Sequence, residues 1–203
     1  MPELLTSPLG LPAVAVLAYL LGSVPFGIVM ARLFGLGDLR QIGSGNIGAT
    51  NVLRTGNKLA AFLTLILDAG KAGIAVLIAR AVVGHEDAAQ LAGLAAFFGH
   101  CFPVYLRFKG GKGVATYLGT MLALSWPIGL AACGTWLLVA VISRYSSLSA
   151  LLSVASLPLW MLALGQPQMI ALALCLIALI YWRHWENIQR LRAGTETKIG
   201  KKG

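Results

Sequence analysis

Charged residues are scarce in this sequence. Asp, Glu, Lys and Arg make up 11% of the 203 residues, whereas roughly 25% is usual for a soluble domain. Hydrophobic residues make up 58%. This composition excludes an ordinary soluble protein. It predicts one integral membrane domain that covers residues 1–203.

Acidic residues and cysteines are fewer still. There are 7 acidic and 16 basic residues, for a formal net charge of +9. The basic residues lie at the ends of apolar runs, so the charge does not indicate a nucleic-acid partner. Cys101, Cys133 and Cys175 stand singly in apolar sequence, with no Cys-x-x-Cys pair and no Cys/His cluster. We therefore expect no disulfide framework, no metal site and no cofactor.

Seven apolar runs are candidate membrane-spanning helices, so the predicted fold is an all-α bundle of seven transmembrane helices. A crossing needs about 20 apolar residues, and the first two runs satisfy this comfortably. The fourth and fifth runs are short and are separated by Pro127. They could be two short passes or one re-entrant hairpin, and we favour two passes. The runs are Pro12–Leu33, Leu59–Ala79, Ala88–Leu106, Val114–Trp126, Ile128–Ser143, Leu148–Leu164 and Gln168–Trp182.

Basic residues gather in alternate connections between these runs. In a seven-span arrangement these connections and the C-terminal tail all lie on one side, which the positive-inside rule assigns to the cytoplasm. The N-terminus is then outside and the C-terminus inside. The sequence before the first run has no positively charged segment typical of a signal peptide, so we expect that run to be retained. The cations are Arg32, Arg40, Arg54, Lys58, Arg107, Lys109, Lys112, Arg144, Arg183, Arg190, Arg192, Lys198, Lys201 and Lys202.

The stretch Gly99–Thr116, GHCFPVYLRFKGGKGVAT, combines cations with glycines. Glycine lets the backbone turn its N–H groups toward a ligand, and a helix beginning at Val114 would add its free N–H groups. This pattern predicts an anion site that suits phosphate. A basic topological loop would explain the lysines but not the glycines. The stretch does not fit the Walker A pattern, which argues against a nucleoside triphosphatase.

A second polar loop, Gly43–Asn51 (GSGNIGATN), is followed by Arg54. Its short polar side chains can bind an anion or fix turns, and the Arg54 guanidinium suits phosphate. The glycines also match G-x-G-x-x-G. An apolar helix precedes them where a dinucleotide site needs a strand, so we reject that interpretation.

The tail carries His184, Asn187 and Arg190 at spacings that place them near one face of a helix. His184 could be a general base, a phosphate ligand or an interfacial residue. Ser147 could donate to an anion, although capping the following helix is the simpler interpretation.

Asp68, Lys71 and His100 are ionisable residues in the interior of the apolar runs. Asp68 and Lys71, three residues apart in the second run, are interpreted as a structural ion pair rather than as catalytic groups. His100 is interpreted as a packing residue.

Together these motifs resemble one family. GSVPFG (Gly22–Gly27), GSGNIGATN, DAGKAG (Asp68–Gly73), the Gly99–Thr116 stretch, RYSSL (Arg144–Leu148) and the tail His184–Lys198 are similar to the bacterial acyl-phosphate:glycerol-3-phosphate acyltransferases, the PlsY family. The resemblance covers nearly the whole chain in order. It implies a multi-pass bacterial inner-membrane enzyme, with its site facing the cytoplasm, that starts phospholipid synthesis by moving a fatty acyl group from acyl phosphate to the 1-hydroxyl of glycerol 3-phosphate.

The resemblance also implies roles for residues. The partners would be glycerol 3-phosphate, acyl phosphate and membrane lipids, and attack would be direct, without an acyl-enzyme. The proton acceptor would be His184 or a phosphate oxygen of the substrate. A transporter or flippase of a phosphorylated metabolite, and a lipid-binding scaffold, remain alternatives. The expected substrate-binding residues are Ser44, Gly45, Asn46, Asn51, Arg54, Lys109, Gly110, Gly111, Lys112, Gly113, Ser147 and Asn187.

Overall fold

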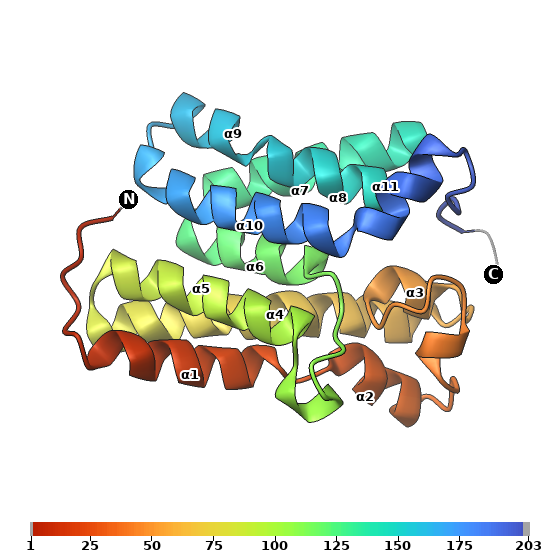
Figure 1. The fold of residues 1–203 in the computed structure, drawn as a ribbon, viewed down its shortest axis with the longest axis horizontal. Coiled ribbons are helices and arrows are strands. Elements are labelled where there is room, and N and C mark those ends of the chain that lie inside the picture. The colour runs from red at the N-terminus through yellow and green to blue at the C-terminus, as the bar shows by residue number, and fades with distance from the viewer. Residues whose placement is uncertain (1, 201–203) are drawn as a thin grey trace.

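The computed structural model describes residues 2–200, and every regular element in that range is helical (Figure 1). The predicted all-α architecture is therefore confirmed. Short 3₁₀ turns occur at Leu39–Gln41, Val104–Leu106 and Pro167–Met169. The α-helices are α1 (Gly10–Gly22), α2 (Phe26–Leu33), α3 (Ala49–Leu53), α4 (Lys58–Val83), α5 (Glu86–Cys101), α6 (Val114–Leu124), α7 (Trp126–Ser143), α8 (Ser146–Ala155), α9 (Leu157–Ala163), α10 (Ile170–Arg183) and α11 (Trp185–Arg192).

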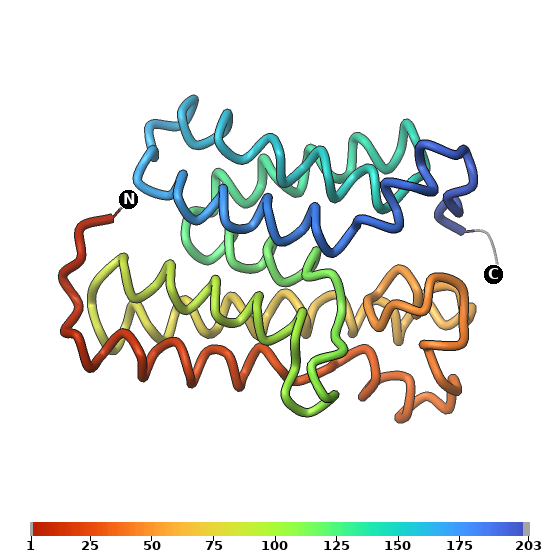
Figure 2. Tube along the Cα trace, in the orientation of Figure 1, coloured from red at the N-terminus to blue at the C-terminus, as the bar shows by residue number. Residues whose placement is uncertain are grey.

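The helices form two groups that lie side by side along the long axis of the molecule. One group contains α1, α2, α4 and α5, and the other contains α7 to α11 (Figures 1 and 2). Helix α6 lies between them and packs on both α4 and α7. Helices α3 and α11 and the C-terminus lie together at one end of the bundle. This arrangement brings the polar segments of the sequence to the same end.

Helix length and composition agree with a membrane-embedded bundle. Within residues 2–200, four helical segments are long and apolar enough to cross a membrane, and the number rises to six if each of two bent helix pairs is one span. The predicted count of seven requires α6 as a further, short span. The four segments are Gly10–Leu33, Lys58–Val83, Glu86–Leu106 and Trp126–Ser143.

Breaks interrupt several of the predicted runs. The run predicted as continuous over Pro12–Leu33 is divided into α1 and α2 at Ser23–Pro25, because Pro25 has no N–H to continue the helix. Helices α8 and α9 form one bent pair, at 40°. Helices α10 and α11 form the other and bend by 63° at His184, which turns α11 away from the direction of α10.

Helix α6 is short because the loop before it descends into the bundle. After α5 ends at Cys101, the chain loops out and returns beside α5 before α6 begins at Val114 (Figure 2). Gly113 packs on the ring of Phe97, one turn inside the end of α5. At its other end α6 is held by Arg80, whose guanidinium donates to the carbonyls of Ala123 and Leu124 at 2.8 and 3.0 Å. Because Arg80 lies in the last turn of α4, α6 reaches the far end of the bundle, which favours the two-pass interpretation.

A buried ion pair lies within α4. Asp68 Oδ1 and Lys71 Nζ are 2.7 Å apart, and the two residues are 2% and 3% exposed. Lys71 Nζ also donates to the carbonyl of Val24 at the break between α1 and α2. The predicted pair is therefore confirmed, and it ties α4 to the neighbouring helices.

Removing one member of this pair should destabilise the bundle. Lys71→Met leaves the Asp68 carboxylate buried without its cation, which costs about 3–5 kcal/mol. We expect a clear fall in the thermal unfolding midpoint in detergent. The matched control is the double variant Asp68→Asn/Lys71→Met, which removes both charges. Its thermal unfolding midpoint should fall by less than that of Lys71→Met. Equal losses in the two variants would contradict the ion-pair explanation.

Candidate active site

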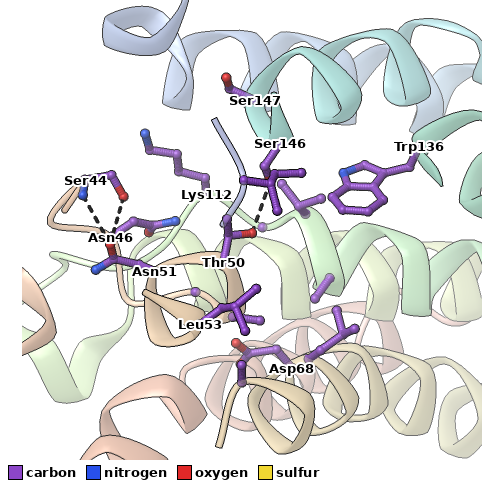
Figure 3. Close-up of a pocket in the computed structure, with 18 of the residues that line it drawn as sticks. Ser44, Asn46, Thr50, Asn51, Leu53, Asp68, Lys112, Trp136, Ser146 and Ser147 are labelled. Carbon is purple, nitrogen blue, oxygen red and sulfur yellow. Dashed lines mark hydrogen bonds between the residues drawn. The ribbon is translucent and has the colours of Figure 1, made fainter. Parts of the chain in front are cut away.

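A cavity of about 580 Å³ opens at the end of the bundle that carries α3 and α11. Its wall is built by the loop before α3, the first half of α4, the starts of α6 and α8, part of α7, and the C-terminal tail. Figure 3 shows Lys112 between Asn46 and Ser147, with Trp136 at the opposite side and Asp68 below. The predicted site residues in this wall are Ser44, Asn46, Asn51, Arg54, Lys112, Gly113, Ser147, His184 and Asn187.

The loop before α3 is held in shape by Asn51. Asn51 Oδ1 accepts hydrogen bonds from the N–H and the hydroxyl of Ser44 at 3.1 and 3.4 Å. Its Nδ2 donates to the carbonyl of Leu39 at 2.8 Å. The buried amide of Asn51 is therefore occupied within the loop, where it fixes the backbone and side chain of Ser44 beside the cavity.

Arg54 lies across this loop. A side chain at Gly43 would put its Cβ 2.6 Å from Arg54 Nη1, so glycine at this position, with φ of +53°, leaves room for the guanidinium. Nη2 donates to Thr197 Oγ1 at 2.7 Å. Nη1 is buried and has no hydrogen-bond partner among residues 2–200. An unpaired buried guanidinium nitrogen is costly, which suits a site completed by an anion.

Lys112 stands at the other side of the polar end. Its amine donates to Asn187 Oδ1. Burial, reinforced by the nearby cation Arg190, lowers the pKa of Lys112 to about 8. An anion bound beside this amine would stabilise its charged form.

Glu196 was missed by the sequence interpretation, although it organises the tail. Its carboxylate accepts hydrogen bonds from Ser147 Oγ at 2.7 Å, Asn187 Nδ2 at 2.6 Å and Arg190 Nε at 2.7 Å. Burial acts to raise its pKa, but these three donors outweigh burial and hold the pKa below its usual range. The available signal was an acidic residue beyond the end of α11 in a tail that is mostly basic.

The capping interpretation of Ser147 is wrong. Helix α8 begins at Ser146, its N-cap residue is Tyr145, and no side chain caps it. Ser147 lies two residues after the N-cap position, inside the helix. Its hydroxyl is directed to the Glu196 carboxylate instead.

His184 lies at the bend between α10 and α11 and is 3% exposed. Its Nδ1 is 2.8 Å from the carbonyl oxygen of Ile180. Because a carbonyl only accepts, Nδ1 carries the proton, and Nε2 of the neutral ring keeps its lone pair. A histidine in this state can accept a proton in the cavity.

Four predicted residues do not line the cavity: Gly45, Lys109, Gly110 and Gly111. Lys109 is exposed. The N–H groups of Gly110 and Gly111 donate to the carbonyls of Cys101 and His100 at 3.2 and 3.1 Å. The glycines therefore do not present free N–H groups to an anion, because the loop uses them to pair with the end of α5.

The remainder of the wall is mainly apolar. Helix α4 contributes Phe62 and Leu65, α6 contributes Leu118, and α7 contributes Trp136 and Leu137. These side chains continue from the polar end toward the middle of the bundle. One cavity therefore has charged groups at its polar end and an apolar wall beyond them.

Two further contacts close the polar end. Thr50 Oγ1 and Ser146 Oγ lie 3.1 Å apart and join the first loop to the start of α8 (Figure 3). Ile199 N donates to the carbonyl of Arg144 at 2.7 Å and ties the tail to the same region. Lys58, from the first turn of α4, also lines the cavity. Sequence patterns gave no pairing for these residues, because the contacts join segments far apart in the chain.

The sequence model of the glycerol-3-phosphate acyltransferase family matches residues 12–194. The chain belongs to this family. Curated relatives named glycerol-3-phosphate acyltransferase include one from Jannaschia sp. (strain CCS1), 66% identical over 98% of each chain. Another, from Cereibacter sphaeroides (strain ATCC 17025 / ATH 2.4.3), is 65% identical over 100% of this chain and 96% of the relative.

Solved structures show the same fold in the acyltransferase family. The glycerol 3-phosphate form of PlsY (YgiH), an integral membrane glycerol 3-phosphate acyltransferase, matches with a TM-score of 0.87 and 42% identity. That match covers 94% of this chain and 96% of the other. The lysophosphatidic acid form matches at 0.85 and 41%, over 94% and 95%. The family resemblance and the integral membrane fold are therefore confirmed.

The lowered pKa of Lys112 can be tested by chemical labelling. Since its pKa is about 8, the amine should be mostly charged below pH 8 and mostly neutral and nucleophilic above it. Brief labelling with an amine-reactive anhydride at several pH values, read by mass spectrometry, should therefore show half-maximal modification near pH 8. Lys112→Arg provides the control, since its peptide should lose the label. A midpoint above about pH 10, the ordinary range of lysine, would contradict the burial argument.

Proposed function

We propose that the chain transfers a fatty acyl group from acyl phosphate to the 1-hydroxyl of glycerol 3-phosphate. The product is 1-acyl-glycerol 3-phosphate (lysophosphatidic acid), which starts phospholipid synthesis. The observation that carries this proposal is the shared cavity: Arg54, Lys112 and His184 lie at its polar end, and an apolar wall continues from them. Membership of the glycerol-3-phosphate acyltransferase family supports the acceptor.

The polar end would hold the phosphate groups. Arg54 has a buried guanidinium nitrogen without a partner in residues 2–200, and Lys112 adds a second cation. Ser44 and Asn46, on the loop fixed by Asn51, would add neutral donors. Two phosphorylated reactants need more than one cationic group, and the cavity provides them from different segments.

The apolar wall would hold the acyl chain. Leu65 and Leu137 face the cavity from α4 and α7, in a bundle whose outer surface is apolar. A fatty chain could therefore enter from the lipid phase while glycerol 3-phosphate enters from water. We infer that the site faces the cytoplasm from the bacterial inner membrane, because the cationic connections are concentrated at the cavity end.

The reaction would be a direct displacement. The glycerol hydroxyl oxygen attacks the acyl carbonyl carbon, the bond from that carbon to the phosphate oxygen breaks, and inorganic phosphate leaves. The hydroxyl proton passes to His184 Nε2 or to a phosphate oxygen of the substrate. Acyl phosphate is a mixed anhydride with a good leaving group, so positioning and charge stabilisation would provide most of the acceleration.

Purified protein in detergent or lipid cubic phase should form 1-acyl-glycerol 3-phosphate from acyl phosphate and glycerol 3-phosphate. Inorganic phosphate should be released in equal amount. A parallel reaction with acyl-CoA should yield little product. In the proposed reaction the leaving group is the phosphate of acyl phosphate, which binds at the cationic end of the cavity, and acyl-CoA has a thiol leaving group instead. Product formed with acyl-CoA as donor but not with acyl phosphate would contradict the proposed donor. Absence of product from either donor, together with uptake of labelled substrate into proteoliposomes, would favour a transporter.

Replacing His184 separates catalysis from binding. If His184 accepts the proton, His184→Ala should lower kcat by roughly 10²–10⁴-fold with a small change in KM. His85→Ala is the matched control, since His85 precedes α5 and does not line the cavity. An unchanged kcat with a raised KM would assign His184 to binding and leave the substrate phosphate as the proton acceptor.

A further inference from the structure

Arg183 adjoins His184 but does not line the cavity. It is the last residue of α10, and its guanidinium lies against the loop between α5 and α6. Nε donates to the carbonyl of Gly111 at 3.1 Å, and Nη2 donates to the carbonyl of Gly110 at 3.0 Å. Two donors from one planar group thus bind two successive carbonyls.

The other edge of this loop is bound to α5. The N–H groups of Gly110 and Gly111 donate to the carbonyls of Cys101 and His100. Both the N–H and the carbonyl of each glycine are therefore hydrogen-bonded. The strip is held between the end of α5 on one side and Arg183 on the other.

The backbone of Gly111 packs against the buried ring of His100. A Cβ added there would fall 2.2 Å from Nε2 of the buried His100 ring, so the backbone rests directly on the imidazole. His100 Nδ1 is 3.0 Å from Lys71 Nζ and 3.5 Å from Asp68 Oδ1, which fixes the ring from behind. On the outer side, the Arg183 guanidinium carbon lies 5.3 Å from the centre of the Phe102 ring.

We infer that Arg183 is a positioning residue that fixes Lys112 at the cavity before substrate arrives. Lys112 follows Gly111 directly, and three of the four residues 110–113 are glycine. A glycine-rich backbone loses much conformational entropy when it is ordered, so without Arg183 part of the binding free energy of the substrate would be spent on ordering the loop. This inference rests on the proposed role of Lys112 in binding glycerol 3-phosphate.

A double-mutant cycle tests this assignment. The KM for glycerol 3-phosphate is measured for wild type, Arg183→Ala, Lys112→Ala and the double variant, alongside kcat. Arg183→Ala should raise KM roughly tenfold or more in the wild-type background, because two charge-assisted hydrogen bonds are lost. In the Lys112→Ala background the same change should raise KM less than about twofold, since groups acting through one another are not additive. Equal fold increases in both backgrounds would overturn the inference.

Two further variants keep the test decisive. Arg183→Lys retains the charge near Phe102 but cannot bind two carbonyls, so it should give a smaller KM increase that also disappears in Lys112→Ala. If Arg183→Ala does not fold, the comparison of Arg183→Lys in the wild-type and Lys112→Ala backgrounds replaces the cycle made with Arg183→Ala. Arg192→Ala, at an exposed position in α11, is the matched control and should behave as wild type.

A readout of the loop itself completes the test. Hydrogen exchange at the amides of Gly110 and Gly111 should become faster in Arg183→Ala, and unchanged exchange would overturn the inference. The two proposals can fail separately. A normal KM in Lys112→Ala would contradict the binding role of Lys112, whereas additive KM effects would contradict only the positioning role of Arg183.

Discussion

Positive charge that is half-buried at the end of an apolar helix bundle is stable only when an anion or a set of acceptors faces it. In this chain the resident anion is Glu196, which binds Arg190 directly and reaches Lys112 through Asn187. It makes no hydrogen bond to Arg54, whose Nη1 has no partner among residues 2–200. This buried nitrogen without an acceptor is the feature that a bound phosphate would satisfy.

The rest of the fold holds these charges in position. Asp68, Lys71 and His100 form a buried polar network that supports the loop from below. Arg183 binds the same loop from α10. The 63° bend at His184 then turns α11, so that Asn187 faces Lys112 while α10 remains in the bundle. Packing in the apolar core and charge at its end are thus connected through one short loop.

Much of this arrangement follows from the sequence. Apolar runs predicted the helices, and the motifs that resemble the acyltransferase family identified Arg54, Lys112 and His184 as site residues, which the structure places around one cavity. Local patterns are sufficient for the helices, because helix periodicity is a property of neighbouring residues. The site residues were identified through the family resemblance. The roles of the individual site residues remain predictions.

Other features depend on contacts between distant segments and could not be predicted. Glu196 meets Ser147 across 49 residues, and only the folded chain shows that Ser147 serves this carboxylate instead of capping α8. Gly110 and Gly111 looked like free anion donors in sequence. Their N–H groups are taken by α5, because the loop descends beside that helix. Composition indicates which groups are present but not which partner each one reaches.

The central claim is that one cavity holds both reactants, with phosphate at Arg54 and Lys112 and the acyl chain along α4 and α7. The most direct measurement is a crystal structure of this chain with glycerol 3-phosphate and a non-hydrolysable acyl phosphate analogue. The account predicts phosphate oxygens within hydrogen-bond distance of both cations and the chain against Leu65 and Leu137. A phosphate bound away from Arg54 and Lys112, or an acyl chain outside this cavity, would contradict it.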